Sequence, residues 1–171
     1  MRYKVAFRTF FTNASVIAAT KLSLVWLSGL LLGGFVGVDT AYGLSPLFLL
    51  TPPYDATFLG IFLVLFIPLL FSVCLRFLFS ADAILLVVFL KAAEFALVVV
   101  ACFCSWGSAG WLISRLLLFS TFLNLPVLIW AWYRILCSNF GRRETFISII
   151  LMLIIGLADY FFVSPFLCSL F

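Results

Sequence analysis

The 171-residue sequence contains no histidine, and only 9% of its residues are charged. Without imidazole the chain lacks the side chain that most often acts as general base or metal ligand, which excludes Ser-His and Cys-His catalytic arrangements. The sequence also lacks a P-loop, an HExxH motif and a G-x-S-x-G motif, since Gly107-Ser108-Ala109-Gly110 does not fit the last of these. We therefore expect neither an enzyme nor a protein with a cofactor or a bound metal.

Hydrophobic residues are abundant instead, at 67% of the chain with a mean hydropathy of +1.35. A soluble domain averages about 25% charged and 45–50% apolar residues, and a domain of ~150 residues buries only about 70% of its chain's surface. The five cysteines include no CxxC pair, so we interpret them as small apolar residues. The composition predicts an integral protein of the cell membrane whose first partner is the lipid bilayer, and the net charge of +4 does not indicate nucleic acid.

Long apolar stretches predict the fold class. A bilayer core of about 30 Å needs ~20 apolar residues per helix, and the sequence supplies five such stretches. We therefore predict an all-α, multi-pass helix bundle that forms one domain over residues 1–171. The predicted spans are 22–38, 56–79, 83–104, 111–133 and 145–165. In residues 1–21 the apolar side chains recur at helical spacing, which fits either an amphipathic helix on the cytoplasmic face or an extension of the first span.

The basic residues predict the orientation of this bundle. Eight of the ten Lys and Arg residues fall in segments that five spans would place on one side, and none falls in the segments on the other side. These residues are Arg2, Lys4, Arg8, Lys21, Arg76, Arg134, Arg142 and Arg143. Because cytoplasmic loops carry the excess of Lys and Arg, we expect the N-terminus inside the cell and the C-terminus outside.

Five polar residues inside the predicted spans are candidate site residues, because a charge at mid-helix costs roughly 2.5–3.5 kcal/mol on insertion scales. Lys91 and Glu94 are three residues apart, so we expect them to neutralise each other and to turn toward the bundle interior. Arg115 and Asp159 lie at matching depths in the last two spans, which predicts an interhelical ion pair. Asn124 precedes a proline by two residues and could bond Lys91 or the carbonyl that the proline frees. The set either holds the bundle in register or forms a proton or ion pathway, and its division into separate pairs favours the first.

Small residues in the first span suggest a packing surface. Gly29, Gly33 and Gly37 form G-x-x-x-G-x-x-x-G, a flat strip that allows another helix to approach closely. The strip fits packing within the chain, and it also fits docking of a partner or of a second copy in a homo-oligomer. Aromatic residues near both ends of the fourth span predict interfacial anchors. They are Trp106, Trp111, Trp130, Trp132 and Tyr133.

The second half of the chain resembles a known family. The resemblance rests on Phe89-Leu90-Lys91, on Asn124-Leu125-Pro126 in the following span, and on Ala158-Asp159-Tyr160-Phe161-Phe162-Val163-Ser164-Pro165 near the C-terminus. In this order the motifs resemble the stage II sporulation protein M family of Firmicute membrane proteins, over roughly residues 89–167. Five spans with the N-terminus inside are also the topology described for that family. The resemblance implies a noncatalytic scaffold that organises peptidoglycan-degrading partners, the stage II sporulation proteins D and P, during forespore engulfment.

Two functions from different classes follow from these observations. The first is the scaffold, which the small extramembrane mass, the lack of catalytic groups and the resemblance favour. The second is the membrane subunit of a multi-component transporter for a small solute or ion, which the polar residues inside the spans favour.

Overall fold

The computed structural model describes residues 14–43, 58–110, 119–163 and 165. Over these residues the chain is helical and contains no strand, which confirms the all-α prediction for this part of the chain. The elements are α2 (Ala14–Gly43), α4 (Phe58–Leu78), the 3-10 turn η1 (Ala81–Ala83), α5 (Ile84–Trp106), α7 (Phe119–Leu136), α8 (Arg142–Ala158) and the π-helical turn η2 (Asp159–Val163).

Four helical stretches in the described residues are long and apolar enough to cross a membrane, which indicates a membrane protein. They are Ala14–Asp39, Phe58–Leu78, Ala81–Trp106 and Arg142–Phe162. The predicted span 111–133 is described only from residue 119 onward, where α7 gives a shorter apolar helix, and 111–118 lie outside the described residues. The first helix begins at Ala14, so residues 14–21 extend the first span, whereas 1–13 lie outside the described residues.

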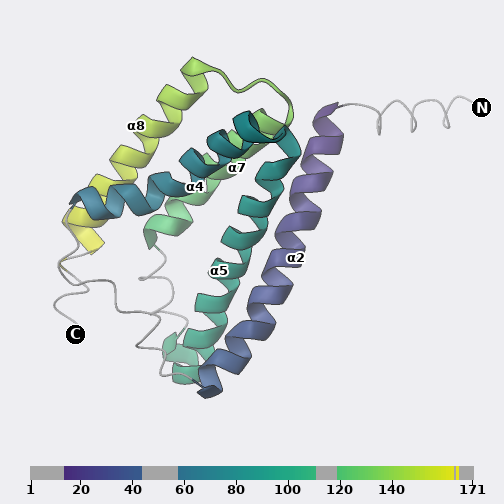
Figure 1. Cartoon of the computed structure of the whole chain (residues 1–171). Coiled ribbons are helices and arrows are strands. Elements are labelled where there is room, and N and C mark those ends of the chain that lie inside the picture. The colour runs from purple at the N-terminus through teal and green to yellow at the C-terminus, as the bar shows by residue number, and fades with distance from the viewer. Residues whose placement is uncertain (1–13, 44–57, 111–118, 164, 166–171) are drawn as a thin grey trace, which may run out of the picture.

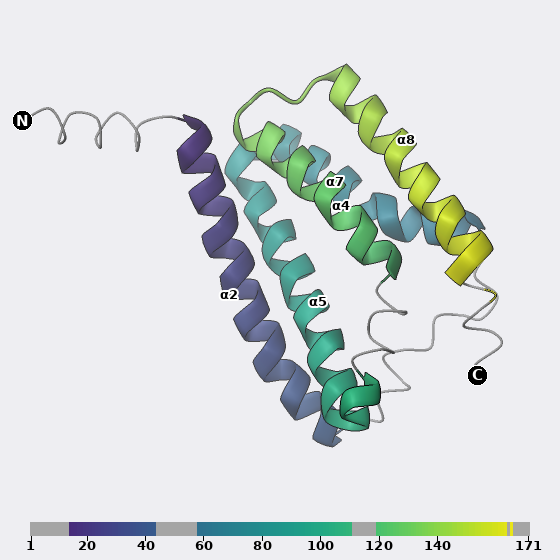
Figure 2. The same cartoon turned by 180° about the vertical axis from the view of Figure 1, so that it is seen from behind.

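The helices form two groups that meet at one end of the bundle (Figures 1 and 2). In the first group α2 and α5 lie side by side and run in the same direction, whereas α4, α7 and α8 form the second group. α4 changes direction along its length in both views, and Pro68 stands in the middle of this helix, where its missing N–H interrupts the backbone hydrogen bonds. The chain direction reverses from each of the five helices to the next, as in a multi-pass bundle.

The buried core lies where the two groups meet. Side chains from all five helices contribute to it, including Leu22 of α2, Leu69 of α4, Val88 of α5 and Met152 of α8. The largest fully buried side chain is Trp132 of α7, which packs against Trp26 of α2 with ring centroids 6.5 Å apart. The prediction that Trp132 anchors the helix at the membrane interface is therefore wrong. Its indole finds a polar partner inside the bundle, which removes the need for contact with water or headgroups.

The outer faces of the helices carry large apolar side chains that no described residue covers. On α2 the most exposed are Leu24, Leu31 and Phe35, and on α8 they include Phe146 and Ile154. A water-soluble chain rarely exposes contiguous apolar surface of this extent, whereas hydrocarbon solvates it at no cost. The exposed faces and the helix lengths thus give the same indication of a membrane environment.

Candidate functional site

The glycine strip of α2 packs against α5 of the same chain. A Cβ atom at Gly29 would lie 2.8 Å from Cβ of Ala92, and one at Gly37 would lie 2.9 Å from the carbonyl oxygen of Leu97. At Gly33 a Cβ would overlap the carbonyl oxygen of Ala93 and lie 2.7 Å from its Cα. The two backbones are in direct contact, which only residues without a side chain permit. The strip therefore serves packing within the chain. The alternative was that a partner or a second copy docks on the strip, but α5 occupies that surface.

Lys91 and Glu94 form an ion pair on α5. The Lys91 Nζ donates to both carboxylate oxygens of Glu94, at 2.9 and 3.1 Å. The Lys91 side chain is 10% exposed and that of Glu94 is 54% exposed, so the pair reaches from the packed side of the helix to its outer surface. The expectation that both residues turn inward holds for Lys91 and is wrong for Glu94. Positions three residues apart on an α-helix point about 60° away from each other around the helix axis. This angle is enough to place Glu94 beyond the edge of the packed face.

Asn124 braces α7 against α4. Its side chain is 2% exposed, and its Nδ2 donates to the carbonyl oxygen of Leu65 at 3.1 Å. The sequence predicted that Asn124 would bond Lys91 or a carbonyl of its own helix. Both predictions are wrong, because the partner is a carbonyl of α4. Leu65 lies one turn before Pro68, and its carbonyl oxygen has a second lone pair that can accept from another helix in addition to the N–H four residues later. The Oδ1 atom of Asn124 has no hydrogen-bond partner among the described residues.

A second polar brace joins the same two helices about two turns away. The indole Nε1 of Trp132 donates to Oγ of Ser72 at 2.8 Å, and Ser72 in turn donates to the carbonyl oxygen of Pro68 at 2.7 Å. Both side chains are fully buried. The sequence analysis missed Ser72, because a serine inside an apolar helix commonly bonds its own preceding turn and gives no signal of an interhelical contact. Pro68, four residues earlier in the same helix, was the sequence feature that could have pointed to a polar contact at this position.

The predicted pair of Arg115 and Asp159 falls partly outside the described residues. Arg115 belongs to 111–118, and the structure therefore does not describe its position. Asp159 is half-buried and begins the π-helical turn η2, directly after α8. The ion pair stays a prediction.

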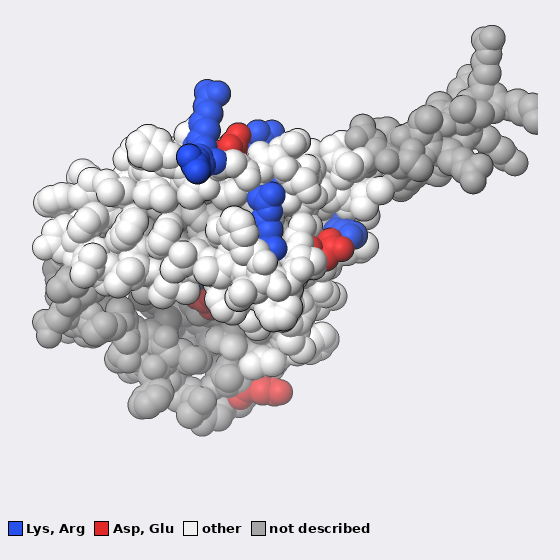
Figure 3. Space-filling model, turned by 45° about the horizontal axis from the view of Figure 1, so that its top comes forward, with Lys and Arg blue, Asp and Glu red and all other residues white. Residues whose placement is uncertain are grey.

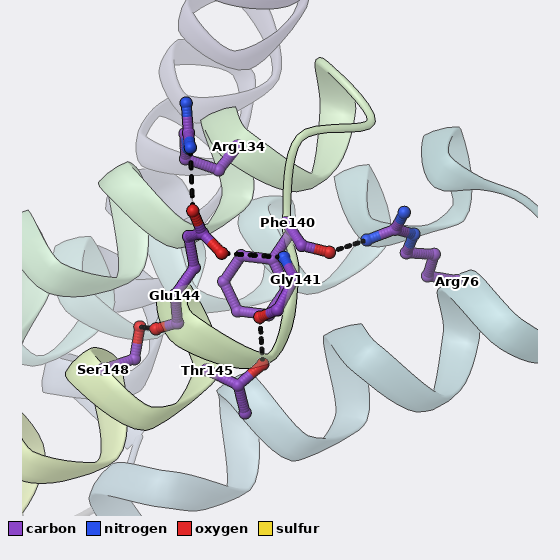
Figure 4. A network of polar contacts seen from close by, with 7 residues as sticks. All are labelled: Arg76, Arg134, Phe140, Gly141, Glu144, Thr145 and Ser148. Carbon is purple, nitrogen blue, oxygen red and sulfur yellow. Dashed lines mark hydrogen bonds and ion pairs between the residues drawn. The ribbon is translucent and has the colours of Figure 1, made fainter.

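A network of charged and backbone groups connects α4, α7 and α8 at one end of the bundle (Figure 4). Arg134 Nη2 contacts Glu144 Oε1 at 2.9 Å, and the other carboxylate oxygen of Glu144 accepts a hydrogen bond from the backbone N–H of Gly141 at 3.0 Å. Arg76 Nη1 donates to the carbonyl oxygen of Phe140 at 3.0 Å. The spacing of Gly141 and Glu144 is that of an N-cap residue and a carboxylate at N3, which marks the start of α8 in the sequence itself.

Lys and Arg side chains gather at this end of the molecule, whereas some acidic side chains lie away from it (Figure 3). Lys21, two turns into α2, contacts Asp82 of η1, with Nζ 2.8 Å from one carboxylate oxygen. Five of the six described Lys and Arg residues, all except Lys91, lie at this end of the bundle, four of them in terminal turns of helices and Lys21 beside η1. They are Lys21, Arg76, Arg134, Arg142 and Arg143. The predicted separation of charge along the bundle is therefore present in this part of the chain.

The chemistry of these groups is that of interhelical braces. Carboxylates, guanidinium groups, an amide and an indole each bond another helix or a backbone carbonyl at ordinary hydrogen-bond distances. No group of three or more His, Cys, Asp and Glu side chains that could hold a metal ion occurs in the described part. In comparisons with known proteins, no family model, no curated protein and no solved structure matches this chain.

Proposed function

We propose that this chain is a noncatalytic integral membrane scaffold, similar to stage II sporulation protein M, that organises peptidoglycan-remodelling partners during forespore engulfment. The observation that carries the proposal is the use of the polar side chains inside the bundle. Asn124 and Trp132 each donate a hydrogen bond to a neighbouring helix, and such bonds favour one fixed arrangement of the helices over a cavity that opens and closes. A scaffold needs that fixed arrangement.

The proposal includes five membrane spans with the N-terminus in the cytoplasm and the C-terminus outside. Its support is the alternating direction of α2, α4, α5, α7 and α8 together with the gathering of cations at one end. Because Lys and Arg are retained on the cytoplasmic side, that end would face the cytoplasm of the cell membrane. α7 would complete the fourth span together with the residues that precede it.

Partners that fit this scaffold are the membrane-anchored stage II sporulation proteins D and P. Because α5 covers the glycine strip, such partners would contact the outward faces of the helices, where the side chains are apolar and accessible from the bilayer. A second copy of the chain could use the same faces.

Co-purification tests the scaffold. The tagged chain would be co-expressed with the stage II sporulation proteins D and P, extracted in mild detergent and captured beside an unrelated tagged multi-pass protein. We expect both partners to remain bound to this chain and not to the unrelated one. Gly33→Ala should release them because it separates α2 from α5, whereas Gly34→Ala is the matched control that should retain them. Recovery of neither partner above the unrelated protein would contradict the proposal, as would peptidoglycan hydrolysis by the purified chain alone.

A transporter subunit is the second candidate, and the pair on α5 is the observation that favours it. Lys91 is seven residues after the start of α5, which is about 10 Å along the axis, and its carboxylate partner reaches the outer surface of the helix. Proteoliposome flux measurements would test this function with Glu94→Gln, beside Asp82→Asn as a carboxylate control at the end of the bundle. Flux that depends on Glu94 alone would support transport, and equal flux in both variants would remove its support.

A further inference from the structure

Three arginines at the charged end have no carboxylate partner in the described part of the chain. Two cations there are neutralised, Lys21 by Asp82 and Arg134 by Glu144. The other three, Arg76, Arg142 and Arg143, belong to the end of α4 and the start of α8. This part of the surface therefore keeps an excess of positive charge after its ion pairs are counted.

Arg76 is held beside the segment that leads into the other two arginines. Arg76 reaches across from α4 to the carbonyl oxygen of Phe140 at 3.0 Å, only two residues before Arg142 (Figure 4). Arg142 and Arg143 occupy the first turn of α8 and are exposed. The one carboxylate near them, Glu144, is turned to Arg134 and to the N–H of Gly141, so it is already compensated. An incoming anion would meet three guanidinium groups and no unpaired carboxylate.

Large aromatic side chains adjoin these arginines. Phe146 is 65% exposed and lies one helical turn beyond Arg142 and Arg143, which places it on the same side of α8. Phe77 and Phe79 are 82% and 75% exposed and follow Arg76 where α4 ends, so they lie at the charged end itself, level with the arginines or beyond them. Arginines at the end of the bundle with the exposed ring of Phe146 on their membrane side match a molecule that has a negative headgroup and an apolar body, and they do not match a small soluble anion.

We propose that Arg76, Arg142 and Arg143 bind the phosphate of an anionic phospholipid, with its acyl chains against Phe146 of α8. Guanidinium groups suit this ligand because their planar N–H donors match two phosphate oxygens at once. The lipid lies between α4 and α8, at the junction that Arg76 already bridges through Phe140. The site is independent of the scaffold function, because it depends on the charges of this end alone.

Native mass spectrometry of the purified full chain in neutral detergent tests this site. The chain would be mixed with equal amounts of phosphatidylglycerol and phosphatidylcholine that carry the same acyl chains. We expect the bound phosphatidylglycerol to exceed the bound phosphatidylcholine by well over tenfold, because each basic residue near an anionic surface adds roughly fivefold in affinity. In the double variant Arg142→Gln with Arg143→Gln, which leaves Arg76, the preference should fall to about fivefold or less.

The controls separate a defined site from general attraction by charge. Lys21→Gln removes one positive charge at the same end, but this lysine is already paired with Asp82, so the lipid preference should stay as in the wild type. Arg143→Gln alone should give an intermediate preference, which provides a second measurement if the double variant does not fold. Glycerol phosphate, which lacks acyl chains, should not displace the lipid.

Each contrary result overturns the proposal. Equal binding of the two lipids by the wild type would show that no anionic headgroup is recognised. An equal loss of preference in Lys21→Gln and in the arginine variant would show attraction to total charge rather than a site. Displacement by glycerol phosphate would show an anion site for soluble phosphates. Co-purification of the proposed protein partners is measured separately, so its outcome does not affect this result.

Discussion

Substitution of Gly33 by alanine probes the contact between α2 and α5 directly. A single methyl group at this position would overlap the carbonyl oxygen of Ala93 and would lie 2.7 Å from its Cα, whereas real Cβ contacts essentially never fall below 3.0 Å. The opposing atoms are backbone, so no rotation of a side chain can make room. The two helices would have to move apart along the strip, and the contacts at Gly29 and Gly37 would loosen with it.

The expected cost follows from two opposing contributions. Overpacking of a well-packed contact costs about 1–3 kcal/mol, and alanine in place of glycine in a helix gains up to ~1 kcal/mol. Because the opposing backbone is rigid, we expect Gly33→Ala to lower the free energy of unfolding by about 1–2 kcal/mol. For a chain of this size that corresponds to a decrease in the unfolding midpoint of roughly 2–8 °C.

The neighbouring glycine gives the matched control. A Cβ at Gly34 would meet only Cγ2 of Val100, at 4.0 Å, so the same methyl group fits there. Thermal unfolding in mild detergent, followed by circular dichroism, would compare both variants with the wild type. We expect Gly34→Ala to unfold at or slightly above the wild-type temperature. If Gly33→Ala unfolds no lower than Gly34→Ala, the direct backbone contact of α2 and α5 is refuted.

Three other predictions concern the polar braces and the orientation. Trp132→Phe removes the hydrogen bond to Ser72 and should lower the free energy of unfolding by about 1–2 kcal/mol, and an unchanged denaturation curve would speak against this brace. Glu144→Gln should lower the unfolding midpoint by weakening the contact with Arg134. Added salt should reduce the difference in unfolding midpoint between the variant and the wild type. A difference in midpoint that does not depend on salt would exclude an ionic origin of the effect. Ser138→Cys, which lies exposed between α7 and α8, should react with a membrane-impermeant thiol reagent only after the cells are opened. Labelling of intact cells at this position, with the native cysteines replaced, would reverse the proposed orientation.

The sequence by itself determined the fold class, the approximate helix positions and the gathering of charge at one end. Hydropathy and length are local properties, and the cost of exposing backbone polar groups to hydrocarbon leaves the helix as the natural form of a long apolar stretch. The third predicted span, 83–104, agrees with α5 at Ile84–Trp106 to within two residues. The first span was predicted to begin at Leu22, whereas α2 begins at Ala14, because the polar residues between them do not stop a helix.

Only the tertiary structure decided which face of each helix is buried and what each polar group contacts. It set α5 against the glycine strip, placed Trp132 in the core, and gave Asn124 a partner on α4. The physical reason is that in a bilayer the lipid-facing and the core-facing side chains are both apolar, so the sequence carries no polar face that would reveal the packed one. The direction in which a buried indole or amide points then depends on which helix lies beside it.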